Sequence, residues 1–204
     1  MLSPLPLQAD QQPQAQSGTE ADKKIDDRHA SKDSAALAGR QAVGYNRRMH
    51  KKVIFVCSAN FYRSRYAEHY FNWLAGRENL GWRADSRGLM VGTWGNIGAI
   101  SHHTADALKQ RGIPLEQEPR DPKALTLADL TEADLVVAVK EAEHRAMMAA
   151  QFPLWKDRIE YWHVDDLDCA EAHEALPFLE QQIHALVERL RTAERRDGRS
   201  RQAG

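Results

Sequence analysis

The sequence predicts a single-domain α/β protein with an open, doubly wound sheet of four mostly parallel strands and helices on both faces. Short apolar segments rich in β-branched residues alternate with longer segments whose apolar residues recur at helical spacing. The chain has 204 residues. Once its polar ends are set aside, residues 49–190 remain, which is an ordinary size for one domain.

The first expected strand is the clearest. Residues 52–56 are nearly all apolar and mostly β-branched, as is typical of a strand buried on both faces of a parallel sheet. The other expected strands cover residues 81–89, 133–139 and 158–164.

Five helices are expected, and each is bounded by turn or capping residues. Ser101 is of the type that caps a helix, and this helix is expected to end at Gln110, before Gly112. The others cover residues 64–78, 126–132, 140–150 and 172–190, the last with an apolar stripe on one face.

Both ends of the chain are polar. Residues 1–48 hold few large apolar residues, so we expect a disordered extension. Met49 directly precedes the first strand, and we hypothesise that it is the native start; a native peptide from before Met49 would refute this. In residues 191–204 arginines outnumber acidic residues, and we expect a basic, disordered tail.

The composition argues against several classes of partner. The net charge of −1 gives no reason to expect nucleic acid or an anionic membrane as a partner, and no apolar run has the length of a membrane span. With only Cys57 and Cys169 and no export signal, a cytoplasmic location is expected. The histidines show no metal-ligand spacing and the glycines form no dinucleotide or Walker motif, so no metal and no cofactor are expected.

The segment "CSANFYRS", residues 57–64, joins the first strand to the first helix. Its backbone N–H groups can surround a tetrahedral oxyanion, and the helix N-terminus and Arg63 add positive charge. The same field favours the thiolate of Cys57, which Ser64 can stabilise, while the Asn60 amide can hold the loop in shape. A thiolate beneath a bound phosphate can attack phosphorus in line. The competing interpretation is a buried, inert thiol.

The stretch "VIFVCSANFYRSRYAE" resembles the active-site segment of the low-molecular-weight protein tyrosine phosphatases, whose pattern is Cys-x-x-Asn-x-x-Arg-Ser. The resemblance covers residues 49–190 and includes "ADSRG" and "ISHHTADALKQRGI". It implies that Cys57 is the nucleophile, Arg63 binds the phosphoryl group, Asn60 holds the loop and Ser64 stabilises the thiolate. The other residues of the phosphate-binding loop are then Ser58, Ala59, Phe61 and Tyr62.

The resemblance also implies a general acid in a loop after the last strand, where the family carries Asp-Pro-Tyr. The corresponding stretch is "WHVDDLDCA", and the spacing favours Asp166, with Asp165 and Asp168 as alternatives. Leu167 stands where the family usually has Pro.

Other positions depart from the family's pattern. Ala59 replaces a usual Gly and Arg65 a usual Pro, and Tyr62 stands where many members have a second cysteine. Phe61, Tyr62 and Trp94 are expected to form aromatic walls for a phenyl phosphate, with simple packing as the alternative for Trp94.

The expected function is a cysteine-dependent phosphomonoesterase, most directly a protein tyrosine phosphatase that acts on phosphorylated proteins and is inhibited by phosphate and vanadate. Three alternatives remain. An arsenate reductase would need a cysteine relay, for which Cys169 is the one candidate. A phosphoprotein-binding module would show no turnover. A protein arginine phosphatase is disfavoured because the relatives with that activity carry Thr where Phe61 lies.

Overall fold

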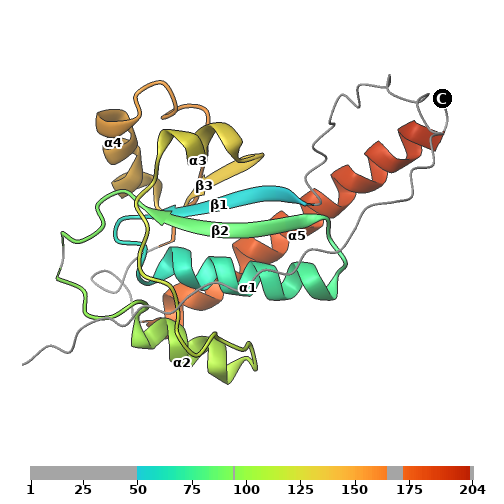
Figure 1. The fold of residues 1–204 in the computed structure, drawn as a ribbon. Helices are drawn as coiled ribbons and strands as arrows, with labels where there is room; N and C mark the ends of the chain where they lie inside the picture. The colour runs from blue at the N-terminus through green and yellow to red at the C-terminus, as the bar shows by residue number, and fades with distance from the viewer. Residues whose placement is uncertain (1–49, 94, 165–171, 203–204) are drawn as a thin grey trace, which may run out of the picture. The chain divides into compact units, whose positions relative to one another are not determined.

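The computed structural model describes residues 50–93, 95–164 and 172–202 (Figure 1). The expected extension over residues 1–48 and Trp94 lie outside the described residues. Helices and strands alternate along the chain in the order β1 (Lys51–Cys57), α1 (Arg63–Arg77), β2 (Trp82–Gly88), α2 (His102–Gln110), α3 (Leu127–Glu132), β3 (Leu135–Ala138), α4 (Glu141–Gln151), β4 (Glu160–Tyr161) and α5 (Ala172–Gln202).

The strands form one sheet in the order β2-β1-β3-β4, and every adjacent pair is parallel. The predicted fold class is therefore confirmed. The chain passes from β1 to β2 on one side and then crosses to β3 on the other, so the direction of winding changes at β1.

Alternate side chains of β1 pack into two hydrophobic layers. Val53 and Phe55 lie in the layer with α1 and α5, whereas Ile54 and Val56 face the layer that includes residues of α3 and α4. All four side chains are fully buried. Figure 1 shows the two groups of helices on opposite faces of the sheet. A central strand buried on both faces explains why its sequence is an unbroken apolar run.

The fourth strand is shorter than the sequence predicts. We predict a strand over residues 158–164, but β4 spans only Glu160–Tyr161. It lies at the edge of the sheet and has β3 as its one neighbour, which itself ends at Ala138. The N–H of Trp162 still donates to the carbonyl of Ala138 at 2.8 Å. The chain thus remains beside β3 without a regular ladder.

The last helix is longer than the sequence predicts. The predicted disordered tail over residues 191–204 is wrong for most of its length, because α5 continues to Gln202. Arg191 donates to Glu78 at the end of α1 (2.8 Å) and to Glu188 on α5 (2.7 Å). These pairs and residues of good helix propensity extend α5 beyond its apolar stripe.

Within the described ranges, no helix combines the length and the apolar character needed to cross a membrane.

Candidate active site

The loop between β1 and α1 begins at the carboxyl end of β1, an inner strand of the sheet. It follows Cys57, the last residue of β1, and leads into Arg63, the first residue of α1. Because β1 pairs with β2 on one side and β3 on the other, this is the point where the strand order changes direction. Open α/β sheets bind ligands at such a point.

Hydrogen-bond donors converge on the Cys57 side chain, which is 3% exposed. Its Sγ lies 2.9 Å from Oγ of Ser64 and accepts the backbone N–H of Asn60 at 3.3 Å. Because Nδ2 of Asn60 donates to Oγ of Ser64 (3.1 Å), the Ser64 hydroxyl proton can point toward the sulfur. Both contacts place a hydrogen-bond donor against the sulfur.

Asn60 fixes the shape of the loop. Its φ of 53° lies in the left-handed region, which Asn tolerates better than most residues. Oδ1 accepts the backbone N–H of Lys123 (2.8 Å) and a guanidinium N–H of Arg120 (3.1 Å), while Nδ2 also donates to Oγ of Ser86 (2.8 Å). The side-chain amide thus ties the loop to β2 and to the segment before α3.

Arg63 is 1% exposed and lies between the loop, α4 and the segment after β4. Its NH1 donates to the carbonyl of Val164 (3.2 Å), and its NH2 pairs with Glu143 of α4 (3.2 Å). Val164 is the last described residue before residues 165–171. The expected acid Asp166, with Asp165, Asp168 and Cys169, therefore lies outside the described residues.

The first turn of α4 provides a second attachment for the loop. Glu143 accepts a hydrogen bond from Ser58, and Nε2 of His144 lies 3.2 Å from the same hydroxyl. Burial, followed by the positive charge of Arg63, lowers the pKa of His144 to about 3, so the ring is neutral near pH 7. Burial alone would raise the pKa of Glu143, but the Ser58 hydrogen bond and the Arg63 charge hold it below its usual value. Glu143 is therefore an anion at neutral pH.

Arg65, at a position where the family usually has Pro, belongs to an ion-pair network. It is 1% exposed and donates to Glu68 at 3.1 Å. Glu68 also accepts from Ser86 (2.6 Å) and from Arg120 (2.8 Å). Since Ser86 and Arg120 also bind Asn60, this network supports the loop from the β2 side.

Of the three expected aromatic walls, Trp94 lies outside the described residues. Tyr62 is 6% exposed and belongs to the hydrophobic core, so the prediction that it forms a wall for a phenyl phosphate is wrong. Its carbonyl accepts from Thr104 on α2 (3.1 Å) and is thereby turned toward the interior. Phe61 and Ala59 are half-buried, and the Phe61 carbonyl accepts the N–H of Ser101 at 2.9 Å.

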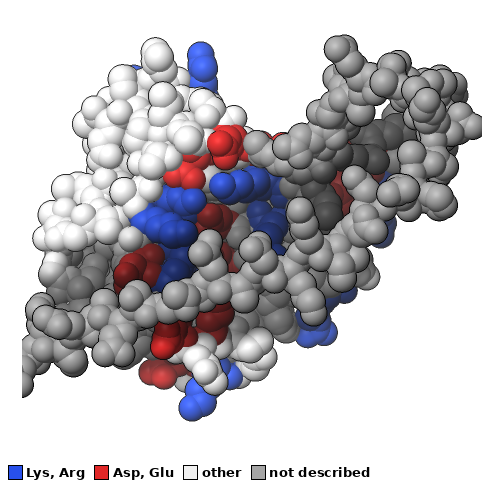
Figure 2. Space-filling model, viewed as in Figure 1, with Lys and Arg blue, Asp and Glu red and all other residues white. Residues whose placement is uncertain are grey.

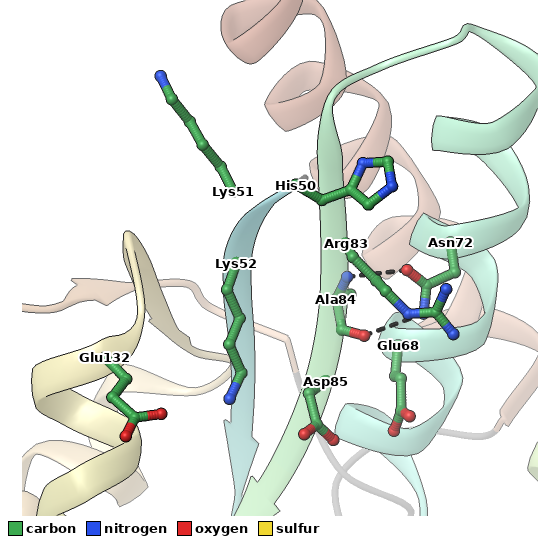
Figure 3. A pocket seen from close by; sticks show the side chains of 9 residues that line it. All are labelled: His50, Lys51, Lys52, Glu68, Asn72, Arg83, Ala84, Asp85 and Glu132. Atoms are coloured by element: carbon green, nitrogen blue, oxygen red, sulfur yellow. Dashed lines mark hydrogen bonds between the residues drawn. The ribbon is translucent and has the colours of Figure 1, made fainter. Parts of the chain in front are cut away.

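A hollow lies near the start of β1 and β2 (Figure 3), toward the opposite ends of these strands from Cys57. Acidic and basic side chains both line it, and Asn72 brackets Ala84 of β2 with two hydrogen bonds (2.8 and 3.0 Å). Figure 2 shows blue and red side chains interleaved on this face rather than in separate patches. Neither basic nor acidic residues predominate in the lining of the hollow.

Sequence reasoning missed residues of other segments that contact the loop, among them Ser86, Arg120 and Glu143. Ser86 lies within "ADSRG", a segment singled out without a role for its serine. Arg120 and Glu143 are 60 and 80 or more positions away from their partners, and no local pattern marks either. Within the described residues, no group of three or more His, Cys, Asp or Glu side chains is placed to hold a metal ion.

Comparison with known proteins agrees with this geometry. The family described as "Low molecular weight phosphotyrosine protein phosphatase" matches residues 52–196. A protein-arginine-phosphatase of Bacillus subtilis is 32% identical over 107 residues, which cover 52% of this chain and 67% of that protein.

Two solved structures are similar over most of the chain. The low molecular weight protein tyrosine phosphatase of T. tengcongensis is 26% identical, with a TM-score of 0.57 over 68% of this chain and 99% of that one. The YwlE arginine phosphatase, in a mutant with a phosphorylated active site serine, is 26% identical, with a TM-score of 0.60 over 71% and 98% of the two chains.

The fold and these relatives define a hydrolase that acts on phosphorylated proteins. The chain belongs to the low molecular weight phosphotyrosine protein phosphatase family.

Proposed function

We propose that this enzyme dephosphorylates phosphotyrosine in proteins through a phosphocysteine formed on Cys57. The observation that carries the proposal is the Cys57 sulfur, held by Ser64 and by the N–H of Asn60 directly before the N-terminus of α1. A stabilised thiolate, a helix N-terminus and a guanidinium are together what phosphoryl transfer to sulfur requires. Arg63 would bind the phosphoryl oxygens and the transition state.

The reaction has two steps. In the first, the Cys57 thiolate attacks phosphorus, a sulfur–phosphorus bond forms, and the bond to the tyrosine oxygen breaks as that oxygen takes a proton from Asp166. In the second, the Asp166 carboxylate removes a proton from water, which attacks phosphorus and releases the thiolate and inorganic phosphate. No metal takes part in either step.

Asp166 is proposed as the acid from its spacing after β4 and from the resemblance of its segment to the family's acid loop. Val164, two residues earlier, accepts a hydrogen bond from Arg63, so the described chain beside the phosphate-binding loop ends two residues before Asp166. Asp165 and Asp168 are the alternatives.

We further propose that residues 49–190 carry the activity and that the enzyme works in the cytoplasm on phosphoprotein substrates. Inorganic phosphate and vanadate would be competitive inhibitors, because each offers oxygens to the same loop as the substrate does.

The test is hydrolysis of p-nitrophenyl phosphate by the full chain in the presence of a chelator, with vanadate and a Cys57→Ser variant alongside. The proposal predicts vanadate-sensitive turnover that disappears in Cys57→Ser. Turnover that needs a metal, or that survives Cys57→Ser, would refute it. Binding of phosphate or vanadate without turnover would instead favour a phosphoprotein-binding module or an arsenate reductase.

A second candidate substrate is phosphoarginine, which is favoured by the 32% identity with a protein-arginine-phosphatase. Phe61 opposes it, because the family resemblance leads us to expect a small Thr at this position in an arginine phosphatase. Parallel assays with a phosphotyrosine peptide and a phosphoarginine peptide of one sequence decide between them. We expect kcat/KM to be higher for phosphotyrosine. A higher value for phosphoarginine would instead make phosphoarginine the substrate.

A further inference from the structure

Glu143 places a carboxylate against the arginine that is proposed to bind phosphate. Its Oε2 accepts from NH2 of Arg63 at 3.2 Å, and its other oxygen accepts from Ser58, the residue after Cys57. The Glu143 side chain is 27% exposed, whereas that of Arg63 is 1% exposed. The guanidinium therefore contacts a protein anion that is itself accessible from solvent.

The hydrogen bonds around Ser58 have a defined direction. Nδ1 of His144 accepts the backbone N–H of Lys140 at 3.1 Å, so the proton of the neutral ring is on Nε2. Nε2 lies 3.2 Å from Ser58 Oγ and donates to it. The Ser58 hydroxyl proton is then directed to Glu143, which acts as acceptor only. This arrangement favours the ionised form of Glu143.

A substrate or product phosphate on Arg63 would add a second anion beside the Glu143 carboxylate. Like charges a few ångströms apart in a partly buried site repel strongly, because solvent screens them poorly. The structure holds Glu143 in place through both Ser58 and Arg63, so its charge cannot simply move away while these bonds persist.

We propose that Glu143 is a built-in counter-ion of Arg63 that weakens the binding of inorganic phosphate and thereby limits product inhibition. The inference rests on the proposed function, because it takes Arg63 as the phosphate-binding residue. After phosphate leaves, the Glu143 carboxylate remains paired with the buried guanidinium. Glu143 acts through Arg63 and touches no reacting atom.

The test is the Glu143→Gln variant of the full chain, which keeps the length of the side chain and an oxygen acceptor for Ser58 but removes the charge. Inhibition of p-nitrophenyl phosphate hydrolysis by inorganic phosphate should become about tenfold stronger. Direct calorimetric titration of phosphate into Cys57→Ser and into Cys57→Ser with Glu143→Gln should show the same tightening.

Glu141→Gln is the matched control. Glu141 lies two positions earlier on α4 and pairs with Arg145 at 2.7 Å, on the outside of the helix. This variant should leave the inhibition constant for phosphate unchanged.

Unchanged or weaker phosphate binding in Glu143→Gln would overturn the proposal, and weaker binding would assign Glu143 to positioning of Arg63 instead. Absence of phosphate binding in every variant would overturn it as well. The calorimetric titration needs no turnover, so it decides the role of Glu143 separately from the proposed chemistry. Turnover that persists in Cys57→Ser would refute that chemistry whatever the titration shows.

Discussion

Arg63 supplies a planar set of N–H donors at the start of α1, where a phosphoryl group would also meet the helix N-terminus. Its guanidinium is oriented by the Val164 carbonyl and the Glu143 carboxylate, each at 3.2 Å. These two contacts limit the orientation of the guanidinium. A lysine has the charge but not the fixed fork of donors.

Arg63→Lys should therefore lower kcat/KM for p-nitrophenyl phosphate by about 100-fold or more, because the bidentate contact to the transition state is lost. Steady-state kinetics measure this loss in kcat/KM. Arg77→Lys is the control, since Arg77 lies in the last turn of the same helix, 4.7 Å from the Trp73 ring. Equal effects of the two changes would contradict the role of Arg63.

Asp166→Asn should slow the release of poor leaving groups most. The expected loss in kcat is larger for phenyl phosphate than for p-nitrophenyl phosphate, because nitrophenolate departs without a proton. The ratio of the two rates measures this effect. If Asp168→Asn changes the ratio and Asp166→Asn does not, the assignment of the acid is wrong.

Whether a site residue could be predicted from the sequence depended on how far along the chain it lies from the loop. Cys57, Asn60 and Arg63 are close in sequence, and one strand-to-helix junction brings them together without other information. Arg120 and Glu143 reach the same loop from remote segments, so their roles depend on packing that no local pattern encodes.

The loop and β2 approach each other closely at Gly88, which pairs with Cys57 in the sheet. A Cβ at this position would lie 2.8 Å from the backbone N of Asn60 and 2.9 Å from the backbone C of Ala59. These are backbone atoms and cannot rotate away. Glycine at this position therefore lets the phosphate-binding loop rest directly on its neighbouring strand.

Gly88→Ala should destabilise the protein by about 1–3 kcal/mol and reduce kcat, because the loop must shift to admit the methyl group. Urea unfolding measures the change in stability, and steady-state kinetics measure the change in kcat. Gly76→Ala on α1 is the control: nothing lies within 4 Å of its added Cβ. In a helix this change should stabilise by about 0.5–1 kcal/mol. Wild-type stability and kinetics in Gly88→Ala would contradict the account.

Among the elements, buried strands and amphipathic helices were the easiest to predict. The strand predicted over residues 52–56 appears as Lys51–Cys57, because its apolar run is buried on both sides. Ser101 takes the predicted N-cap position, but its side chain makes no capping hydrogen bond. The end of α5 has no apolar stripe, and its ion pairs with residues of other elements cannot be seen in a local pattern.

Over the whole molecule, buried titratable groups couple folding to pH. Burial lowers the pKa of His144 to about 3 and also lowers that of His69, so both resist protonation when folded. Burial works against the charged forms of Asp85 and Asp129, but their hydrogen bonds to Arg87 hold the pKa of each below its usual value.

Stability should fall as the pH falls. In the unfolded chain a histidine takes up a proton near pH 6.5, whereas folded His144 does so only near pH 3, so acid favours unfolding between these values. The two aspartates stabilise the fold above about pH 4 and lose this contribution as the pH falls through their lower folded values. The unfolding free energy from urea titrations should thus be smaller at pH 5 than at pH 7.5.

His144→Asn should reduce this difference between pH 7.5 and pH 5, even though it lowers stability overall. His163→Asn is the control, because the His163 side chain is 73% exposed. An unchanged pH difference in His144→Asn would contradict the assignment of the neutral, buried ring.

The most direct test of the account is mass spectrometry of the enzyme quenched during hydrolysis of p-nitrophenyl phosphate. The account predicts one phosphoryl group on the peptide that contains Cys57 in the wild-type enzyme, and loss of turnover in Cys57→Ser. Turnover without any phosphoryl group on that peptide, or wild-type rates in Cys57→Ser, would contradict the assignment of Cys57 as the nucleophile.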